Sequence, residues 1–264
     1  MLERICRLLQ KEDFRKRPLQ AVWRRLYWRL HWRLFPDRPF IVPFYGGMKI
    51  RLANSSASLG IYLNDDFSDR SIAEQFIRFV KPGMIAVDCG AHIGEYTVLF
   101  ARLVGSQGRV HAFEPDPRSF EILKENVSIN HLDNVVLNNC ALADFQGEMD
   151  FLLGGDPTIS SLVKVDRRIR RRTVGCVRVS VTTLDSYVQE TRVTRIDALK
   201  IDVEGAEEAV LNGAREVLSR LQPGLIVVEC ELDPGRIGSL LKDCGYRVSA
   251  IDEKHLFTVL VAER

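Results

Sequence analysis

A regular alternation of short apolar runs and helical patterns, from residue 84 onward, constrains the fold more than any other feature. Seven apolar runs have the length and composition of buried strands, namely 84–89, 109–114, 135–142, 197–203, 225–231, 247–252 and 256–262. Helical patterns separate them, at about 94–104, 117–130, 206–221 and 235–243. Repeated strand, helix and strand predict a parallel α/β sheet that is covered on both faces. The last two strands are joined by a short turn, EKH, and must therefore pair antiparallel.

The stretch from 147 to 183 breaks this rhythm. Two segments within it, GEMDFLL and VRVSVTTL, have the alternation of extra strands, and the loop between them holds the basic cluster RRIRRR. An insertion at this point can shape the mouth of a substrate site, and it can equally be a solvated loop. The sequence leaves both interpretations open.

The first 38 residues differ from the rest in charge. They hold eleven lysines and arginines against four acidic residues, although the whole chain has a net charge of only +2, so the remainder is acidic. No uncharged run here approaches the roughly 20 residues that span a bilayer, and no small-residue cleavage site follows an apolar core. Neither a transmembrane helix nor a signal peptide is predicted.

Residues 18–35 have the periodicity of an amphipathic helix, which begins at Pro18 and ends before Pro36. One apolar stripe follows the three- and four-residue steps of the helix: Leu19, Val22, Trp23, Leu26, Tyr27, Leu30 and Leu34. A basic row and an aromatic row lie beside it, formed by Arg25, Arg29 and Arg33 and by Trp28 and Trp32. Such a helix can lie on an anionic membrane surface, or it can dock on its own domain with a solvated basic face.

The cysteines bear on the cellular compartment. All six lie far apart without a CxxC pair, and several fall within the apolar runs. Buried free thiols in a reducing compartment explain this pattern better than disulfides or a metal site. We therefore expect a cytoplasmic protein, placed peripherally at the inner face of a membrane if residues 18–35 bind lipid.

The stretch VDCGAHIGEY, residues 87–96, lies where the first strand ends and a helix begins. Ligands of open parallel sheets bind beyond the carboxyl ends of the strands. The spacing here is DxGxxxG rather than the GxGxxG of dinucleotide sites, and Asp88 would repel a pyrophosphate, so a nicotinamide oxidoreductase is disfavoured. Asp88 suits an ammonium group, and Glu114, at the end of the next strand, is placed to bind ribose hydroxyls. The two acids together predict S-adenosylmethionine as the cofactor.

Four segments resemble the FkbM family of S-adenosylmethionine-dependent methyltransferases: VDCGAHIGEYT, FEPDP, NNCALAD and LKIDVEGAEEAVLNGA. The resemblance covers roughly residues 80–250. It implies a class I methyltransferase fold, a Rossmann-like sheet with strand order 3-2-1-4-5-7-6 and an antiparallel last strand. We accordingly expect a basic helical extension over 1–38, a cover segment over 39–80 and the methyltransferase domain over 81–264.

The resemblance also implies a set of cofactor-binding residues. Asp88, Gly90 and Gly94 would line the methionine part, Glu114 would hold the ribose, and 139–144 would lie near the adenine. The full set is Asp88, Gly90, Ala91, His92, Gly94, Glu114, Pro115, Asn139, Ala141 and Asp144. His92 departs from the family pattern, in which asparagine is more common.

The family methylates hydroxyl groups, which implies O-methylation of a sugar, glycan or natural-product acceptor. Asp202 and Glu204 would point to the same side if the fourth strand stays extended, and Glu229 ends the neighbouring strand. These three carboxylates are the catalytic candidates. They can act as a general base or substrate holder, or as ligands of Mg²⁺ or Mn²⁺ as in catechol-type methyltransferases. They can also be structural, with Glu204 capping a helix that starts at Gly205.

Two other classes of function remain. A nucleic-acid methyltransferase could use the basic residues of 1–38 and RRIRRR as a phosphate track, but the rest of the chain is acidic and shows no NPPY-type tetrapeptide after the fourth strand. A module that binds the cofactor without transferring a methyl group is the other alternative. The sequence identifies neither the acceptor nor the oligomeric state.

Overall fold

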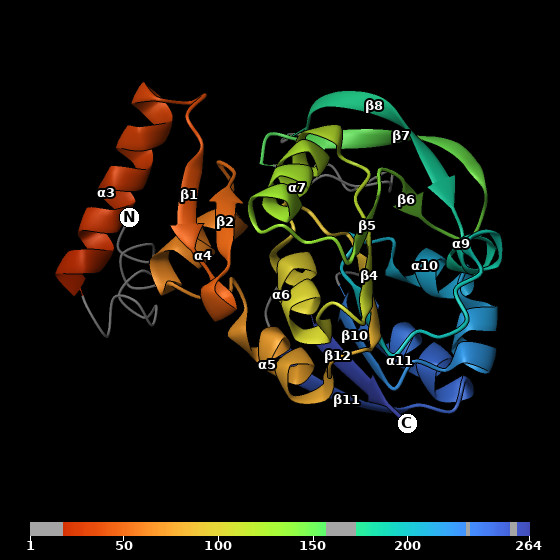
Figure 1. Ribbon diagram of the computed structural model, residues 1–264. Helices are drawn as coiled ribbons and strands as arrows, with labels where there is room; N and C mark the ends of the chain where they lie inside the picture. The colour runs from red at the N-terminus through yellow and green to blue at the C-terminus, as the bar shows by residue number, and fades with distance from the viewer. Residues whose placement is uncertain (1–17, 157–172, 231–232, 254–257) are drawn as a thin grey trace.

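The computed structural model describes residues 18–156, 173–230, 233–253 and 258–264. A seven-stranded sheet of order β11-β12-β10-β9-β3-β4-β5 forms its centre (Figure 1). The strands are β3 (Ile85–Cys89), β4 (Arg109–Phe113), β5 (Val135–Asn138), β9 (Ala198–Ile201), β10 (Leu225–Cys230), β11 (Arg247–Glu253) and β12 (Thr258–Glu263). Strand β12 is antiparallel to both its neighbours, and the other pairs are parallel. Counted along the chain, the order is 3-2-1-4-5-7-6, so the predicted class I topology is confirmed.

Helices cover both faces of this sheet, as the long apolar runs predict. One face packs against α5 (Arg70–Phe79) and α6 (Glu95–Val104), and α7 (Pro117–Ile129) flanks it. The other packs against α9 (Leu184–Thr191), α10 (Glu207–Asn212) and α11 (Pro234–Asp243). Because side chains alternate along a strand, neighbours such as Ala86 and Val87 enter opposite clusters.

The predicted strand 135–142 is wrong in its second half. Strand β5 ends at Asn138, and β6 (Ala141–Leu142) joins a separate three-stranded sheet with β7 (Gly147–Gly154) and β8 (Thr173–Thr182). The side-chain amide of Asn138 donates to the carbonyl of Ala112 at 3.1 Å, and that of Asn139 donates to the carbonyl of Glu114 at 2.7 Å. These polar side chains fasten the end of β5 to β4 where the chain leaves the large sheet. The two extra strands of the insertion are confirmed, and RRIRRR lies outside the described residues.

The helix predicted over 206–221 is also divided. After α10, Gly213 packs so closely on the chain following β6 that an added Cβ would lie 2.0 Å from the carbonyl oxygen of Ala143. A short π-helical turn, Val217–Leu221, follows. Its first amides are bound by the Asp185 carboxylate, which accepts from the backbone of Glu216 and Val217. The turn therefore has its own cap.

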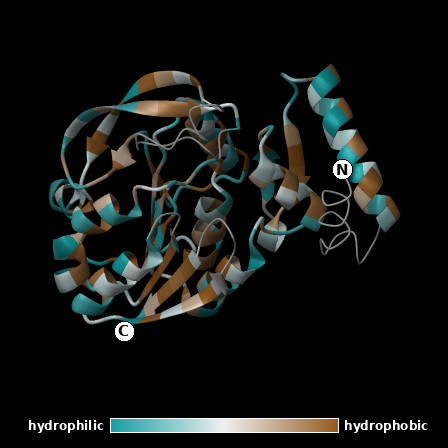
Figure 2. Ribbon diagram, turned by 180° about the vertical axis from the view of Figure 1, so that it is seen from behind, coloured by the Kyte–Doolittle hydropathy of each residue, from teal (hydrophilic) through white to brown (hydrophobic). Residues whose placement is uncertain are grey.

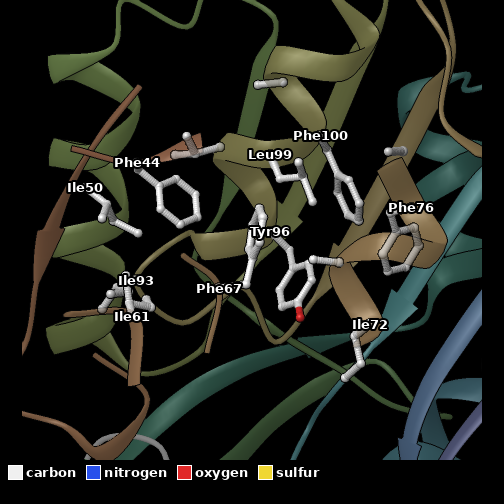
Figure 3. Close-up of a cluster of buried hydrophobic side chains, with 14 of the residues drawn as sticks. Phe44, Ile50, Ile61, Phe67, Ile72, Phe76, Ile93, Tyr96, Leu99 and Phe100 are labelled. Atoms are coloured by element: carbon white, nitrogen blue, oxygen red, sulfur yellow. The ribbon is translucent and has the colours of Figure 1, made fainter. Parts of the chain in front are cut away.

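The segment before the large sheet forms a hairpin of β1 (Phe40–Pro43) and β2 (Lys49–Leu52), followed by α4 (Ser56–Asn64). Two asparagines, one in the last turns of α7 and one directly after the helix, bind the free edge of β2. Asn130 exchanges two hydrogen bonds with the backbone of Lys49, and Asn126 does the same with Arg51. The side chains of Phe44, Ile50, Ile61 and Phe67 then pack with Ile93, Tyr96, Leu99 and Phe100 in one buried cluster (Figure 3). The cover segment thus shares a core with α6.

The amphipathic helix predicted at the N-terminal side is α3 (Pro18–Leu34), and it docks on this hairpin unit (Figure 1). Trp28, only 5% exposed, packs against the rings of Phe40 and Tyr62, which also contact each other. Arg24 donates to the carbonyl of Tyr62 at 2.8 Å and pairs with Asp65 at 2.6 Å, and so binds the C-terminal end of α4. The aromatic row is therefore the docked one, and the apolar stripe points outward. None of the described helices is long and apolar enough to cross a membrane.

Candidate active site

Asp88, at the carboxyl end of β3, is a buried acidic residue of the site. Its Oδ2 accepts a hydrogen bond from the Thr97 hydroxyl at 2.6 Å. Its Oδ1 is buried and has no hydrogen-bond partner among the described residues. Burial raises the pKa of Asp88, and the nearby Lys200 opposes that rise. A cationic group brought to Oδ1 would stabilise the ionised carboxylate.

The glycines of the following loop are required by the protein's own packing. Gly90 has φ +78°, and an added Cβ would lie 1.7 Å from the backbone oxygen of Asp202. Gly94 has φ +93°, and its Cβ would lie 2.6 Å from Cδ1 of Leu123. The family resemblance placed the methionine part of a cofactor beside these glycines, where they have no side chains. The structure fills that space with the end of β9 and with α7, so the loop is held close to both.

His92 takes a left-handed backbone conformation, with φ +50°. Asparagine and histidine tolerate this region better than most residues, which explains why histidine can stand where asparagine is more common. Its backbone amide donates to Oε2 of Glu114 at 2.7 Å. Burial lowers the pKa of His92 to about 4, so the ring is neutral, and Nε2 has no hydrogen-bond partner among the described residues.

Glu114 connects the loop after β3 to the ends of two further strands. Besides the His92 amide, its carboxylate accepts from the backbone of Asp116 at 2.8 Å, on the other side of Pro115. The side chain of Asn139 donates to its carbonyl at 2.7 Å. Burial raises the pKa of Glu114 to about 8. Each carboxylate oxygen already binds one amide and retains a second acceptor position.

Asp116 and Arg118 link this group to the small sheet. The buried Asp116 carboxylate accepts two hydrogen bonds from the Arg118 guanidinium, one from Nε at 3.0 Å and one from Nη2 at 2.6 Å. A further nitrogen of Arg118 donates to the carbonyl of Gly154, at the end of β7, at 3.1 Å. The insertion is therefore tied directly to the residues that follow Glu114.

The predicted adenine-side residues lie on different elements. Asn139 lies at the end of β4 through its bond to Glu114, and Ala91 is buried against Ala112. Ala141, however, belongs to β6 and pairs with Val181 of the small sheet. Asp144 is exposed in the turn after β6. The break after β5 separates these two residues from the strand that was expected to position them.

The second half of the site is built around Lys200, which sequence reasoning missed. This lysine is only 2% exposed, and Nζ lies 2.9 Å from Oδ2 of Asp202 and 3.9 Å from Oε1 of Glu229. Nζ also lies 4.7 Å from the centre of the Tyr96 ring. Burial opposes its charge, but the two carboxylates outweigh burial and raise the pKa of Lys200. The only available signal was the i, i+2 spacing of lysine and aspartate in KIDVEG, which places both side chains on the same side of an extended chain at the end of β9.

Asp202 and Glu229 thus meet around an ammonium group. Burial, reinforced by the charge of Asp202, raises the pKa of Glu229 well above its ordinary value. The amide of Asp202 donates to the carbonyl of Cys89 at 3.0 Å, and the Asp202 backbone packs on Gly90. The backbone that carries the Asp202 side chain is therefore in direct contact with the glycine loop after β3. Lys200 already supplies a positive charge between the two acids.

The expectation that Glu204 points to the same side as Asp202 is wrong in its premise. Strand β9 ends at Ile201, and Glu204 has φ +53° in the turn that follows. The suggested helix start at Gly205 is also wrong, because α10 begins at Glu207, whose carboxylate accepts from the Gly205 amide at 2.8 Å. Among the described residues, no group of three or more histidine, cysteine, aspartate or glutamate side chains is arranged to hold a metal ion.

The cover segment contributes residues to the same region. The Glu95 carboxylate, at the start of α6, accepts from the amide and the hydroxyl of Ser68 at 2.6 and 2.7 Å. The hydroxyl of Tyr96 donates to the carbonyl of Asp69 at 3.1 Å. Burial raises the pKa of Glu95 to about 7. The loop between α4 and α5 therefore borders the site next to Lys200, and no motif in the sequence indicated this.

Comparison with known proteins identifies the family that this chain resembles. The family model described as "Methyltransferase FkbM domain" matches residues 88–248. The curated protein "31-O-demethyl-FK506 methyltransferase FkbM" of Streptomyces tacrolimicus is 28% identical over an alignment 233 residues long, which covers 77% of this chain and 87% of that protein. The "Hexuronic acid methyltransferase AglP" of Haloferax volcanii is 26% identical over 156 residues, which are 59% of this chain and 60% of that protein.

A solved structure supports the fold. The crystal structure of "Methyltransferase FkbM" from Methylobacillus flagellatus KT superimposes with a TM-score of 0.50 at 17% sequence identity. The match covers 80% of this chain and 56% of that one. At this level of identity the likeness concerns the fold alone.

Proposed function

This chain belongs to the FkbM family of methyltransferases, and from that premise we propose that it transfers the methyl group of S-adenosylmethionine to a hydroxyl group of a sugar, glycan or natural-product acceptor. The observation that carries the proposal is the Lys200–Asp202–Glu229 group, packed against the glycine loop after β3. Related proteins whose names specify an O-demethylated natural product or a hexuronic acid support this acceptor class.

The residues of the site around Asp88, His92 and Glu114 fit the cofactor. Asp88 Oδ1 and His92 Nε2 are buried polar atoms without a partner among the described residues, and such atoms are costly unless a ligand or water binds them. We assign Asp88 to the ammonium of the methionine part and Glu114 to the ribose hydroxyls. When bound, the cofactor supplies an electrophilic methyl carbon on a sulfonium sulfur.

The residues of the site around Lys200, Asp202 and Glu229 fit the acceptor. An alcohol is a weak nucleophile until its proton is removed, and a carboxylate within hydrogen-bond reach can accept that proton. Glu229 is the candidate for this role because burial raises its pKa, which makes its ionised form a stronger base than an ordinary carboxylate. Lys200 holds Asp202 and Glu229 together and balances their charge. We assign no metal to this pair, because the Lys200 ammonium lies where a bound cation would otherwise neutralise the two acids.

A transfer assay tests the proposal. Methyl-labelled S-adenosylmethionine is incubated with a panel of a neutral glycoside, a uronic acid glycoside, a polyol macrolide and an RNA oligonucleotide. We expect label in an ether on one of the hydroxylated small molecules, together with stoichiometric release of S-adenosylhomocysteine. Label in the RNA, or binding of the cofactor with no transfer to any of a wide range of hydroxyl acceptors, would contradict it.

Above pH 8, where the carboxylate is ionised, Glu114→Ala should weaken cofactor binding by about 10- to 150-fold, because losing a charged hydrogen-bond acceptor costs roughly 1.5 to 3 kcal/mol. Titration calorimetry on the folded variant measures this affinity. Glu121→Ala, which removes an exposed carboxylate from the neighbouring helix α7, serves as the matched control. Equal affinities of the Glu114 variant and the wild type would remove Glu114 from the ribose site.

A further inference from the structure

Helix α3 has two apolar faces that point in opposite directions. One face holds Ala21, Trp28 and Trp32 and packs on the hairpin unit. The opposite face, here called the outer stripe, has exposed fractions between 44% and 86% and comprises Leu19, Val22, Trp23, Leu26, Tyr27, Leu30 and Leu34. Figure 2 shows α3 at the outer edge of the molecule, with hydrophobic residues along it. A contiguous apolar surface of this kind on a folded protein marks an interaction site.

The outer stripe is held in place by the contacts of the docked face. Trp28 packs with Phe40 and Tyr62, with ring centres 5.3 and 5.8 Å away, and Arg24 is bound to the end of α4. Rotating α3 to bury the stripe would break these contacts and expose Trp28. The stripe is thus a fixed surface of the folded unit.

Basic side chains border the stripe. Arg29 and Arg33 are exposed along one edge and form no ion pair within the described residues. At the end of the helix, the Arg38 guanidinium lies 4.6 Å from the ring centre of Phe35. Residues 18–38 contain five arginines and a single acidic residue, Asp37. The surface is therefore both apolar and cationic.

We propose that the outer stripe of α3 binds an anionic lipid surface. Its aliphatic and aromatic side chains would enter the interface, and Arg29 and Arg33 would bind lipid phosphates. A second copy of the chain is a poorer partner, because a two-fold contact through the stripe would bring the same basic edges together with no acidic residue on α3 to pair with them. Residues 1–17 are also net basic and offer no complementary charge.

Vesicle sedimentation of the full chain tests the inference. The vesicles contain phosphatidylcholine alone or phosphatidylcholine with phosphatidylglycerol. We expect pelleting with the anionic vesicles only, and release at high salt. Arg29→Gln combined with Arg33→Gln should lower the partition coefficient by roughly 30-fold, since each basic residue contributes about fivefold near such a surface. Trp23→Ser with Leu30→Ser should also weaken binding.

Matched controls separate lipid binding by α3 from a general effect of removing any exposed arginine or apolar side chain. Arg247→Gln on β11 removes an exposed arginine, and Val174→Ser on β8 removes an exposed apolar side chain, both outside α3. Neither should change sedimentation. All substituted positions are exposed, and thermal unfolding verifies that each variant is folded. The inference is overturned if wild-type protein does not pellet, if the α3 variants pellet as well as the controls, or if light scattering shows a dimer that Leu30→Ser converts to monomer.

Discussion

Asp202→Asn or Glu229→Gln should lower turnover by about 10²- to 10⁴-fold in at least one of the two variants, while cofactor affinity stays nearly unchanged. Either amide preserves the size of the side chain but cannot accept the hydroxyl proton of the acceptor. Because burial raises the pKa of Glu229, a rate that depends on the ionised Glu229 should rise with pH above the usual range of carboxyl groups. Glu229→Gln should lose this rise. Single-turnover rates at saturating cofactor, measured across pH, decide the matter.

Two comparisons sharpen this experiment. Glu204→Gln should lose less turnover, because Glu204 lies in the turn beyond β9. A chelator should leave the wild type active if Lys200 provides the counter-charge, whereas inhibition that Mg²⁺ or Mn²⁺ reverses would favour a metal. If both main variants keep full turnover with intact cofactor affinity, Asp202 and Glu229 are structural, and His92 becomes the next candidate.

Gly90→Ala should destabilise the fold by roughly 3 kcal/mol or more, rather than only weaken cofactor binding. The added Cβ would lie 1.7 Å from the backbone oxygen of Asp202, which cannot move without displacing the end of β9. The left-handed backbone of Gly90, at φ +78°, adds further strain. Denaturant unfolding monitored by circular dichroism measures the loss.

Gly83 provides the control for this change. It has a similar φ of +84°, but nothing lies within 4 Å of its added Cβ. Gly83→Ala should therefore cost only the backbone strain, on the order of 1 kcal/mol. If Gly83→Ala lowers the free energy of unfolding as much as Gly90→Ala does, the backbone of Asp202 does not restrict a side chain at position 90.

The large sheet was predictable because its strands are buried on both faces and read as apolar runs. The break after β5 was not, because in VVLNNCALA the asparagines that bind β4 look like an interruption of one strand. The cover segment was expected over 39–80 but its helices and strands were not predicted, although Asp69 caps α5 by accepting from the Ser71 amide, and Ile72, Ala73 and Phe76 follow at helical spacing. That signal is readable in the sequence.

The site was predictable where a residue's place at a strand end decides its role. Asp88, Glu114, Asp202 and Glu229 could be placed in this way. Lys200 could not, since a lysine inside an apolar run gives no sign that it is buried and paired. On α3, periodicity revealed two apolar rows, but only packing shows that Trp28 docks while Leu30 faces outward.

The pair of hydrogen bonds that Asn126 makes to the Arg51 backbone of β2 restricts which sequence changes this chain can accept. The same amide also donates to the carbonyl of Ile93, in the loop that precedes α6, at 2.7 Å. Aspartate would keep the acceptor but lose both donors, glutamine is one methylene longer, and alanine would leave Arg51 and Ile93 unpaired. One side chain thus serves the hairpin and the loop after β3 together. A substitution of Asn126 is tolerable only if the hairpin and the loop after β3 change with it. These two parts of the chain must therefore evolve together.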